Sequence, residues 1–251
     1  VHFHVSNIIV YFILPILFYR KCKYFETQHN DANFDVKKKS LYFFIRKFLY
    51  HYKFVYTCAI SLYNKKTVEK VFNIRDCNII VNGRIIPHPY NISNAVLKEI
   101  QKLKSAKDAL CFIHIGRCVK QKNQELLINA FNAFNKTNKA ILLIIGAGFE
   151  SELGEKLQNI SNENIYFLGE KLNVYDYLAC ADAFCLSSIY EGMPITLIES
   201  FSCGCIPIST PVSGCIDYII DGENGFLAKD FSLDSYIDTL LRYKDNFFHI
   251  N

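Results

Sequence analysis

The sequence is poor in glycine, proline and charge. It holds eleven glycines and six prolines in 251 residues, too few for a collagen-like or low-complexity chain. Charged residues make up 21% of the chain and hydrophobic residues 51%, a balance that excludes an intrinsically disordered protein. A chain of this length and composition can bury a sizeable core, in one large domain or two smaller ones.

No apolar run is long enough to span a bilayer. The longest, Ile8–Tyr19, has twelve residues and contains Pro15, whereas a spanning helix needs about 20. Basic residues follow this run, whereas a signal peptide carries them before it. We therefore expect a buried or interfacial helix, with a signal anchor cut short at its start as the alternative.

Metal-binding patterns are also missing. The ten cysteines include no Cys-x-x-Cys pair, and most lie inside apolar runs, so we expect no zinc site but reduced, buried thiols in a cytosolic protein. No Asp-x-Asp occurs among the twelve aspartates. Nothing in the sequence therefore indicates a carboxylate-bound Mg²⁺ or Mn²⁺.

Basic residues are concentrated in the first third of the chain. Residues 1–90 carry 14 Lys and Arg against 5 Asp and Glu, a net charge of +9, whereas the remaining 14 basic and 19 acidic residues give −5. This asymmetry indicates an anionic partner, and without an RNP, helix-turn-helix or zinc pattern we expect no nucleic acid. Lys39, Arg46 and Lys53 recur at seven-residue spacing along a helix predicted over Ser40–Thr57. We expect this basic face to contact an anionic membrane surface, with a solvated face as the alternative.

From about residue 107 onward, short apolar strands alternate with helical stretches. The strands are continuous apolar runs, which is typical of a parallel sheet covered on both faces. The alternation predicts a doubly wound α/β domain. The predicted strands are Leu110–Ile115, Ala140–Ile145, Ile165–Leu168, Ala183–Leu186 and Ile206–Ser209, and the predicted helices are Gln124–Phe134, Glu150–Gln158, Val174–Cys180 and Pro194–Cys203.

The first ninety residues are less regular. Phe25–Gln28, Val55–Ile60 and Asn78–Val81 are predicted as short strands. The two prolines of Ile86–Tyr90 favour extended backbone, which predicts a linker. We therefore expect one domain in residues 1–88 and a second in residues 89–251.

Three glycine turns follow predicted strands, where open α/β sheets bind ligands. Gly116 and Arg117 are followed by Lys122, a combination suited to a diphosphate, although a solvated basic loop has the same composition. Gly146 opens a second turn, which is a weak dinucleotide signal or simply a tight turn. The third turn, Tyr190–Pro194, precedes a helix whose free N–H groups can bind an anion.

Glu191 and Glu199 flank the start of that helix and could hold two parts of an elongated ligand. A capping glutamate and a solvated one are the alternative.

Several motifs occur in a fixed order along the chain. They are Gly116-Arg117 with Lys122-Asn123, Leu143–Gly148, Phe167–Gly169, Ala181–Phe184, the pair Glu191 and Glu199, and Asp221–Leu227. In this order they resemble the nucleotide-binding half of the GT-B glycosyltransferases of the retaining group 1 family. Upstream, His2–His4, Thr27–His29 and Ala59–Ser61 resemble strand ends of that family's first domain. The resemblance implies two Rossmann-like domains with parallel sheets, the first of them incomplete, because the family's opening glycine-rich loop has no counterpart here.

The resemblance also implies a donor site. Arg117 and Lys122 would bind the donor diphosphate, and Gly116 and Gly146 would belong to the same site. Glycosyl transfer passes through an oxocarbenium-like state, so neutralising the departing diphosphate can supply much of the catalysis.

The remaining site residues are likewise implied by resemblance. Glu191 would hold sugar hydroxyls, and the amides of Gly192 and Met193 would lie near the β-phosphate. Glu199 would hold the nucleotide ribose. His29 would face the transferred sugar from the first domain as a catalytic residue, with a core histidine as the alternative.

The expected activity is transfer of a hexose from a nucleotide sugar to a lipid-linked or polysaccharide acceptor. We expect it to be retaining, to need neither metal ion nor cofactor, and to take place in the cytoplasm, at the inner face of the membrane. One alternative is a catalytically incomplete nucleotide-sugar-binding module that requires a partner chain. A GT-B epimerase or phosphorylase ranks last, because no lysine motif for a pyridoxal cofactor is recognisable.

Overall fold

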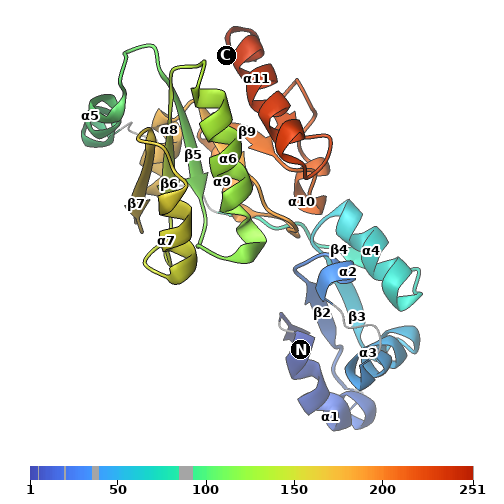
Figure 1. Cartoon of the computed structure of the whole chain (residues 1–251). Coiled ribbons are helices and arrows are strands. Elements are labelled where there is room, and N and C mark those ends of the chain that lie inside the picture. Colours follow the sequence, from blue (N-terminus) through green and yellow to red (C-terminus); the bar gives the residue numbers. More distant parts are fainter. Residues whose placement is uncertain (5, 20, 36–39, 85–92, 251) are drawn as a thin grey trace. The chain divides into compact units, whose positions relative to one another are not determined.

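The computed structural model describes residues 1–4, 6–19, 21–35, 40–84 and 93–250, and they form two compact units (Figure 1). The N-terminal unit comprises Val1–Gly83 together with the loop Tyr190–Pro194, and the C-terminal unit comprises Arg84–Ile189 and Ile195–Asn251. The predicted linker Ile86–Tyr90 and the predicted boundary after residue 88 lie outside the described residues.

The C-terminal unit is built on a parallel six-stranded sheet, which confirms the predicted doubly wound α/β class. Its strand order is β10-β9-β8-β5-β6-β7. The strands are β5 (Leu110–Ile115), β6 (Ala140–Ile145), β7 (Ile165–Gly169), β8 (Ala183–Leu186), β9 (Ile206–Ser209) and β10 (Phe226–Leu227). Four of the five predicted strands have the predicted bounds, and β7 is one residue longer.

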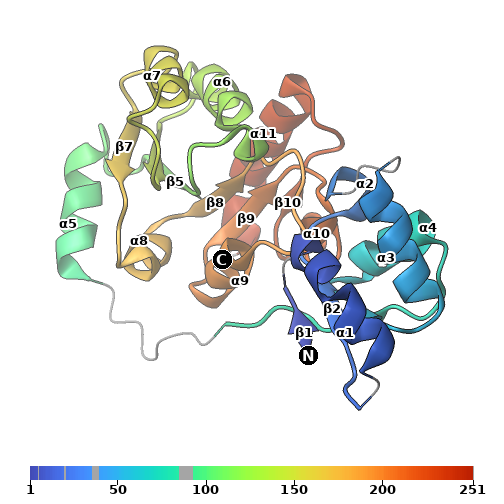
Figure 2. The same ribbon diagram turned by 90° about the horizontal axis from the view of Figure 1, so that it is seen from below.

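Helices cover both faces of this sheet (Figures 1 and 2). They are α5 (Asn94–Leu103), α6 (Gln124–Asn135), α7 (Glu152–Asn159), α8 (Val174–Cys180), α9 (Ile195–Ser202), α10 (Ser213–Ile216) and α11 (Leu233–Ile250), with the short helix η2 (Lys120–Lys122). Because side chains alternate along a strand, Phe112 belongs to a buried cluster that includes residues of α6 and α11, whereas Ile113 belongs to another that includes residues of α5, α8 and α9. Two separate cores therefore hold the sheet rigid from both sides.

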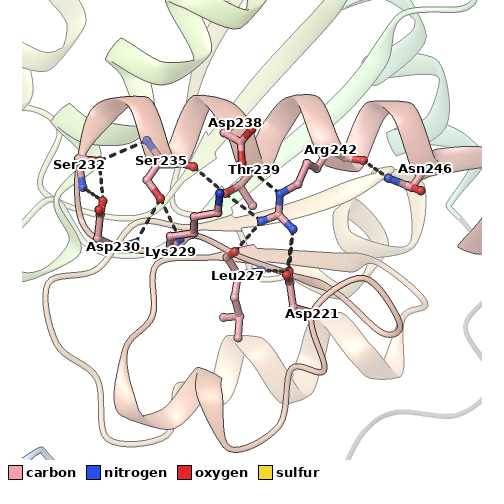
Figure 3. Close-up of polar contacts among 10 residues, drawn as sticks. All are labelled: Asp221, Leu227, Lys229, Asp230, Ser232, Ser235, Asp238, Thr239, Arg242 and Asn246. Carbon is pink, nitrogen blue, oxygen red and sulfur yellow. Dashed lines mark hydrogen bonds and ion pairs between the residues drawn. The ribbon is translucent and has the colours of Figure 1, made fainter.

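The long helix α11 is fastened to the loop before β10 (Figure 3). The guanidinium of Arg242 donates to both carboxylate oxygens of Asp221, at 3.2 and 2.9 Å, and to the carbonyl of Leu227 at 2.7 Å. Asp221 in turn accepts the amide of Leu227 at 2.8 Å. The first turn of α11 is held in the same way, because the Ser235 hydroxyl accepts the backbone N–H of Lys229 at 2.8 Å. The predicted motif Asp221–Leu227 is thus an anchoring loop for α11.

The N-terminal unit contains a parallel four-stranded sheet in the order β1-β2-β3-β4. Its strands are β1 (His2–Phe3), β2 (Phe25–Gln28), β3 (Tyr56–Ala59) and β4 (Asn78–Ile79), and its helices are η1 (Ser6–Phe12), α1 (Ile13–Phe18), α2 (Ala32–Asp35), α3 (Leu41–His51) and α4 (Leu62–Phe72). The apolar run Ile8–Tyr19 forms η1 and α1, with Ile9 and Ile16 in the core. Among the described residues, no helix combines the length and the hydropathy that crossing a membrane requires.

The helix predicted over Ser40–Thr57 is wrong in its last third, residues 52–57. The Ser40 hydroxyl caps the helix start by accepting the amide of Phe43 at 3.2 Å. The helix ends at His51, and Lys53 adopts a positive φ of 55°, a left-handed conformation that turns the chain away from the helix axis. The residues after it then enter β3.

The predicted basic face of this helix is also wrong. Arg46 is buried, where it forms a 2.8 Å ion pair with Glu26 and donates to the Tyr50 hydroxyl at 2.8 Å. Its guanidinium carbon lies 4.9 Å from the centre of the Phe72 ring. Lys53 lies beyond the helix, where it pairs with Asp76, and Lys39 lies outside the described residues.

The exposed face of α3 carries apolar residues instead, namely Leu41, Phe44 and Phe48. The helix is therefore rotated relative to the predicted one, with Arg46 buried against the Glu26 carboxylate and this apolar stripe exposed.

Most cysteines lie in the core, as predicted. Seven are buried, Cys180 and Cys203 are half-buried, and Cys22 is exposed. Burial raises the pKa of Cys111 to about 12 and that of Cys77 to about 11. Their thiols are therefore protonated at neutral pH.

We predict that Arg46→Ala lowers the free energy of unfolding by about 3–5 kcal/mol, because it leaves the Glu26 carboxylate buried without a counter-charge. Urea unfolding followed by circular dichroism measures this. Lys70→Ala, at an exposed position of α4, is the control and should change stability by less than about 0.5 kcal/mol. Equal midpoints for the two variants would contradict the buried ion pair.

Candidate functional site

Two of the predicted glycine turns lie side by side at the carboxyl edge of the C-terminal sheet. Gly116 follows β5 and Gly146 follows β6, and the Gly116 amide donates to the Ile145 carbonyl at 2.9 Å. A Cβ on Gly146 would lie 2.1 Å from the Gly116 carbonyl oxygen, and Gly146 has a φ of +153°. Only glycine fits there, so the two turns are locked together.

The basic residues of the first turn lie next to this contact. The Lys122 side chain passes over Gly116, with its Cδ and Cε 3.4 Å from the place where a Cβ would stand. Arg117 is exposed, and no ion pair among the described residues engages its guanidinium. β5 has β6 on one side and β8 on the other, so this turn lies where the chain order of the strands reverses, the usual ligand site of an open α/β sheet.

A buried histidine supports the turn from below. His114 of β5 is 1% exposed, and its Nδ1 lies 2.9 Å from the Cys185 carbonyl oxygen. Because a carbonyl only accepts, Nδ1 carries the proton, and Nε2 can accept the Gln124 side-chain amide 3.3 Å away. That amide also donates to the Arg117 carbonyl at 2.8 Å. Burial lowers the pKa of His114 to about 4, so the ring is neutral at neutral pH.

The end of β8 braces the same turn from the other side. The Ser187 hydroxyl donates to the Lys122 carbonyl at 2.9 Å, and the Ile189 amide donates to the Gln121 carbonyl at 2.8 Å. The backbone that carries Arg117 and Lys122 follows β5 and is held by hydrogen bonds to the ends of β6 and β8.

Glu199 lies in the same unit, on α9. It is 4% exposed and forms a 2.7 Å ion pair with Arg84, which immediately precedes the undescribed segment 85–92. The Tyr175 hydroxyl donates to the same carboxylate at 3.0 Å. A carboxylate in contact with a guanidinium can still accept hydrogen bonds from other groups.

The remaining predicted residues belong to the N-terminal unit, at the carboxyl ends of its strands. His29 follows β2, and the loop Tyr190–Pro194 packs against it so closely that a Cβ on Gly192 would lie 1.7 Å from the His29 carbonyl oxygen. The His29 backbone therefore occupies the place that a side chain at position 192 would need. Asn82, just after β4, donates to the Met193 carbonyl at 3.3 Å, and Glu191 is buried in the same loop.

Three histidines and a threonine gather beside this loop. His4 Nδ1 lies 3.1 Å from His29 Nε2, and His2 Nε2 lies 2.7 Å from the Thr27 hydroxyl. The His4 contact needs one donor and one acceptor, so the two rings share at most three ring protons. Among the residues that the structure describes, no three histidine, cysteine or carboxylate side chains form a group that could hold a metal ion.

The structure thus brings Gly116, Arg117, Lys122 and Gly146 together and places Glu199 on a helix of the same unit. His29, Glu191, Gly192 and Met193 form a second group, within the N-terminal unit.

Comparison with known proteins identifies the family. The family described as "Glycosyl transferases group 1" matches residues 96–246, more than half of the chain. The chain is 34% identical over 224 residues to the uncharacterized glycosyltransferase MJ1059 of Methanocaldococcus jannaschii, which covers 78% of this chain and 53% of the relative. The chain belongs to the group 1 glycosyltransferases. A second protein of the same organism, the uncharacterized glycosyltransferase MJ1069, is 30% identical over 256 residues, covering 96% of this chain and 64% of that protein. The chain therefore spans about half to two thirds of the length of these relatives.

The solved structures agree with the GT-B fold of this family. The crystal structure of Anabaena Alr3699/HepE in complex with UDP-glucose matches with a TM-score of 0.79 at 15% identity, covering 99% of this chain and 70% of that one. At 15% identity, this structural similarity shows that the two proteins share a fold.

Sequence reasoning missed the supporting residues of this glycosyltransferase. His114 is embedded in the apolar run of β5, and nothing in the run distinguishes a polar residue that supports a loop from a core residue. Arg84 and Tyr175 are separated by 91 positions and have no motif in common. Their pairing could be found only in three dimensions.

We predict that His114 makes stability depend on pH. Its pKa is about 4 in the folded chain and 6.5 when unfolded, so the unfolded state binds more protons between these values. The contribution of His114 to the free energy of unfolding is therefore highest above pH 6.5, and it falls by roughly 3 kcal/mol as the pH drops to about 4. Unfolding curves between pH 4 and 7 measure this.

His114→Gln should flatten that part of the pH profile, whereas His51→Gln, at an exposed position on α3, should leave it as in the wild type. A His114→Gln profile parallel to the wild type would show that His114 does not titrate as proposed.

Proposed function

We propose that this group 1 glycosyltransferase transfers a hexose from a nucleotide-sugar donor to a lipid-linked or polysaccharide acceptor, with retention and without a metal ion. The observation that carries the proposal is the locked pair of glycine turns with Arg117 and Lys122 at the reversal point of the sheet. A turn with a fixed backbone keeps both cationic residues at this edge of the sheet, where they can bind a diphosphate.

In the proposed reaction, the bond between the sugar C1 and the diphosphate oxygen breaks. Negative charge then grows on the departing nucleoside diphosphate, and Arg117 and Lys122 neutralise it while the sugar passes through an oxocarbenium-like state. These side chains would supply the charge that a bound divalent cation supplies elsewhere, so we propose that no resident cofactor takes part.

The other roles follow the family resemblance. Glu199, buried and in contact with Arg84, would accept hydrogen bonds from the ribose hydroxyls. Glu191 and the amides of Gly192 and Met193 would contact the sugar and the β-phosphate. His29, at the end of β2, would face the transferred sugar.

The names of relatives favour a lipid-linked acceptor. One relative in Campylobacter jejuni, 31% identical over 158 residues, transfers N-acetylgalactosamine to a diphospho-undecaprenol-linked sugar. One in Escherichia coli, 27% identical over 161 residues, is a UDP-Gal:alpha-D-GlcNAc-diphosphoundecaprenol galactosyltransferase. We propose an acceptor of this chemical class for the present chain.

Such an acceptor lies in a membrane, and we propose that the N-terminal unit contacts the cytoplasmic membrane surface. Exposed apolar side chains support this, above all Tyr11, Leu14 and Phe18 of η1 and α1, which are 85%, 68% and 79% exposed. Lys21 and Lys23 follow them and are exposed as well. Apolar insertion beside basic residues would replace the basic helix face that the sequence suggested.

We predict that Arg117→Ala and Lys122→Ala each weaken binding of a nucleoside diphosphate by about tenfold or more, because each removes a charge-assisted contact. Isothermal titration with UDP and with GDP measures this. The control is Lys136→Ala, an exposed residue beyond the end of α6, which should bind as the wild type does. Unchanged affinity in both site variants would refute the diphosphate site.

Turnover distinguishes the enzyme from a binding module. Release of nucleoside diphosphate from a nucleotide sugar, in step with glycosylation of an undecaprenyl-diphosphate-linked acceptor, supports the proposed transferase. Tight donor binding with no transfer by the purified chain, restored by a second protein, would favour a module that requires a partner chain.

We predict that the chain floats with vesicles that contain anionic lipid, and that the triple variant Tyr11→Ser/Leu14→Ser/Phe18→Ser does not. The expected cause is loss of apolar insertion, because each Lys near an anionic surface adds only about 1 kcal/mol. Phe231→Ser/Leu233→Ser removes exposed apolar residues of the C-terminal unit and is the control. Equal flotation of the triple variant and this control would reject the proposed contact.

A further inference from the structure

Glu199 is one corner of a closed polar triangle. Arg84 Nε lies 2.7 Å from Glu199 Oε1 and donates to the Tyr175 hydroxyl, also at 2.7 Å. The Tyr175 hydroxyl completes the triangle by donating to Glu199 Oε1 at 3.0 Å. The three residues come from the start of the C-terminal unit, from α8 and from α9, so the contact depends on the folded unit.

Both contacts are made to the same carboxylate oxygen. Oε1 receives the cation and the hydroxyl, whereas no hydrogen bond or ion pair reaches Oε2 from the part of the chain that the structure describes. A carboxylate offers about four lone-pair sites, so two of them stay available on Oε2. The carboxylate side chain is 6% exposed and its rotation would break both contacts, which fixes the direction in which Oε2 can accept.

Arg84 and Tyr175 also stabilise the buried carboxylate of Glu199. An isolated carboxylate at this depth would be strongly destabilised, and a guanidinium in contact compensates the charge. The Arg84 side chain is 46% exposed, so it reaches Glu199 from the solvent side of the unit and is not held by the core itself. The tyrosine hydroxyl, whose pKa is raised by burial, stays protonated and remains a donor.

We infer that Arg84 and Tyr175 are positioning residues that hold Glu199 Oε1 and thereby aim Oε2 at the vicinal ribose hydroxyls of the donor. This inference rests on the proposed function, in which Glu199 binds the ribose. Neither residue needs to touch the nucleotide. Removing either one frees the carboxylate to rotate, and the chain then loses its preference for a ribonucleotide over a nucleotide without these hydroxyls.

The experiment is isothermal titration with three probes, namely UDP or GDP (whichever binds the wild type more tightly), its 2′,3′-dideoxy analogue, and inorganic pyrophosphate. The variants are Arg84→Ala, Arg84→Lys, Tyr175→Phe, Glu199→Gln and the double variant Arg84→Ala/Glu199→Gln. Arg75→Ala, which removes an exposed arginine of the N-terminal unit, is the matched control.

Arg84→Ala and Tyr175→Phe should each weaken ribonucleotide binding about fivefold and leave binding of the dideoxy analogue and of pyrophosphate unchanged. Arg84→Lys, which keeps the cation, should recover part of the loss. Because Arg84 acts through Glu199, the double variant should bind as weakly as Glu199→Gln alone and no more weakly. Arg75→Ala should match the wild type.

The outcomes separate this inference from the proposed function. If Glu199→Gln weakens ribonucleotide binding but Arg84→Ala and Tyr175→Phe do not, the positioning role is wrong and the ribose role stands. Additive losses in the double variant would show that Arg84 contacts the nucleotide directly, and tighter binding by Arg84→Ala would show that it blocks the site; either result overturns the inference. If Glu199→Gln binds the ribonucleotide like the wild type, the proposed ribose role fails and the inference fails with it.

Discussion

A backbone contact that admits no side chain fixes the loop on which the candidate site of the C-terminal unit depends. The turn after β6 lies against the turn after β5, and the hydrogen of Gly146 takes the place where a Cβ would meet the Gly116 carbonyl at 2.1 Å. Steric exclusion thus limits the path of the loop that carries Arg117 and Lys122. The neutral His114 ring, Gln124 and Ser187 then hold that path by hydrogen bonds from below and from the side. The Arg117 side chain is exposed and the Lys122 side chain is half-buried, and both extend from this fixed backbone.

The N-terminal unit uses the same principle with different residues. Gly192 lies on the His29 carbonyl, so the loop that contains Glu191 and Met193 is held by contact between main chains. Beneath it, β2 carries Glu26 in a buried ion pair with Arg46, a charged support where the other unit has a neutral histidine. The neutral support depends on pH, because protonating His114 would place a charge in the core, whereas the charged support depends on an intact ion-pair partner. The two supports therefore respond to different changes.

The fold could be predicted wherever the signal was local. Continuous apolar runs covered on both faces gave the bounds of β5, β6, β8 and β9 as the structure has them. The prediction failed at α3, because the burial of Arg46 depends on Glu26, 20 positions away, and sequence periodicity assigns a long basic side chain to solvent. For the site, the glycines and basic residues were identified by motif, whereas His114, Arg84 and Tyr175 were not, since their roles depend on partners distant in the sequence. Local pattern therefore predicts the elements and the motif residues, and tertiary contact decides which polar residues support them.

The distribution of the cysteines has a practical consequence for labelling chemistry. The thiolate is the reactive form, and burial keeps thiols such as Cys111 and Cys77 protonated and away from reagents. Cys22, between α1 and β2, is the exposed cysteine of the ten, and Cys180 and Cys203 are half-buried in the other unit. A maleimide fluorophore or spin label added in limiting amount would attach first at Cys22 without any engineered cysteine. The natural sequence therefore already provides a spectroscopic handle on the N-terminal unit, close to the apolar side chains of α1.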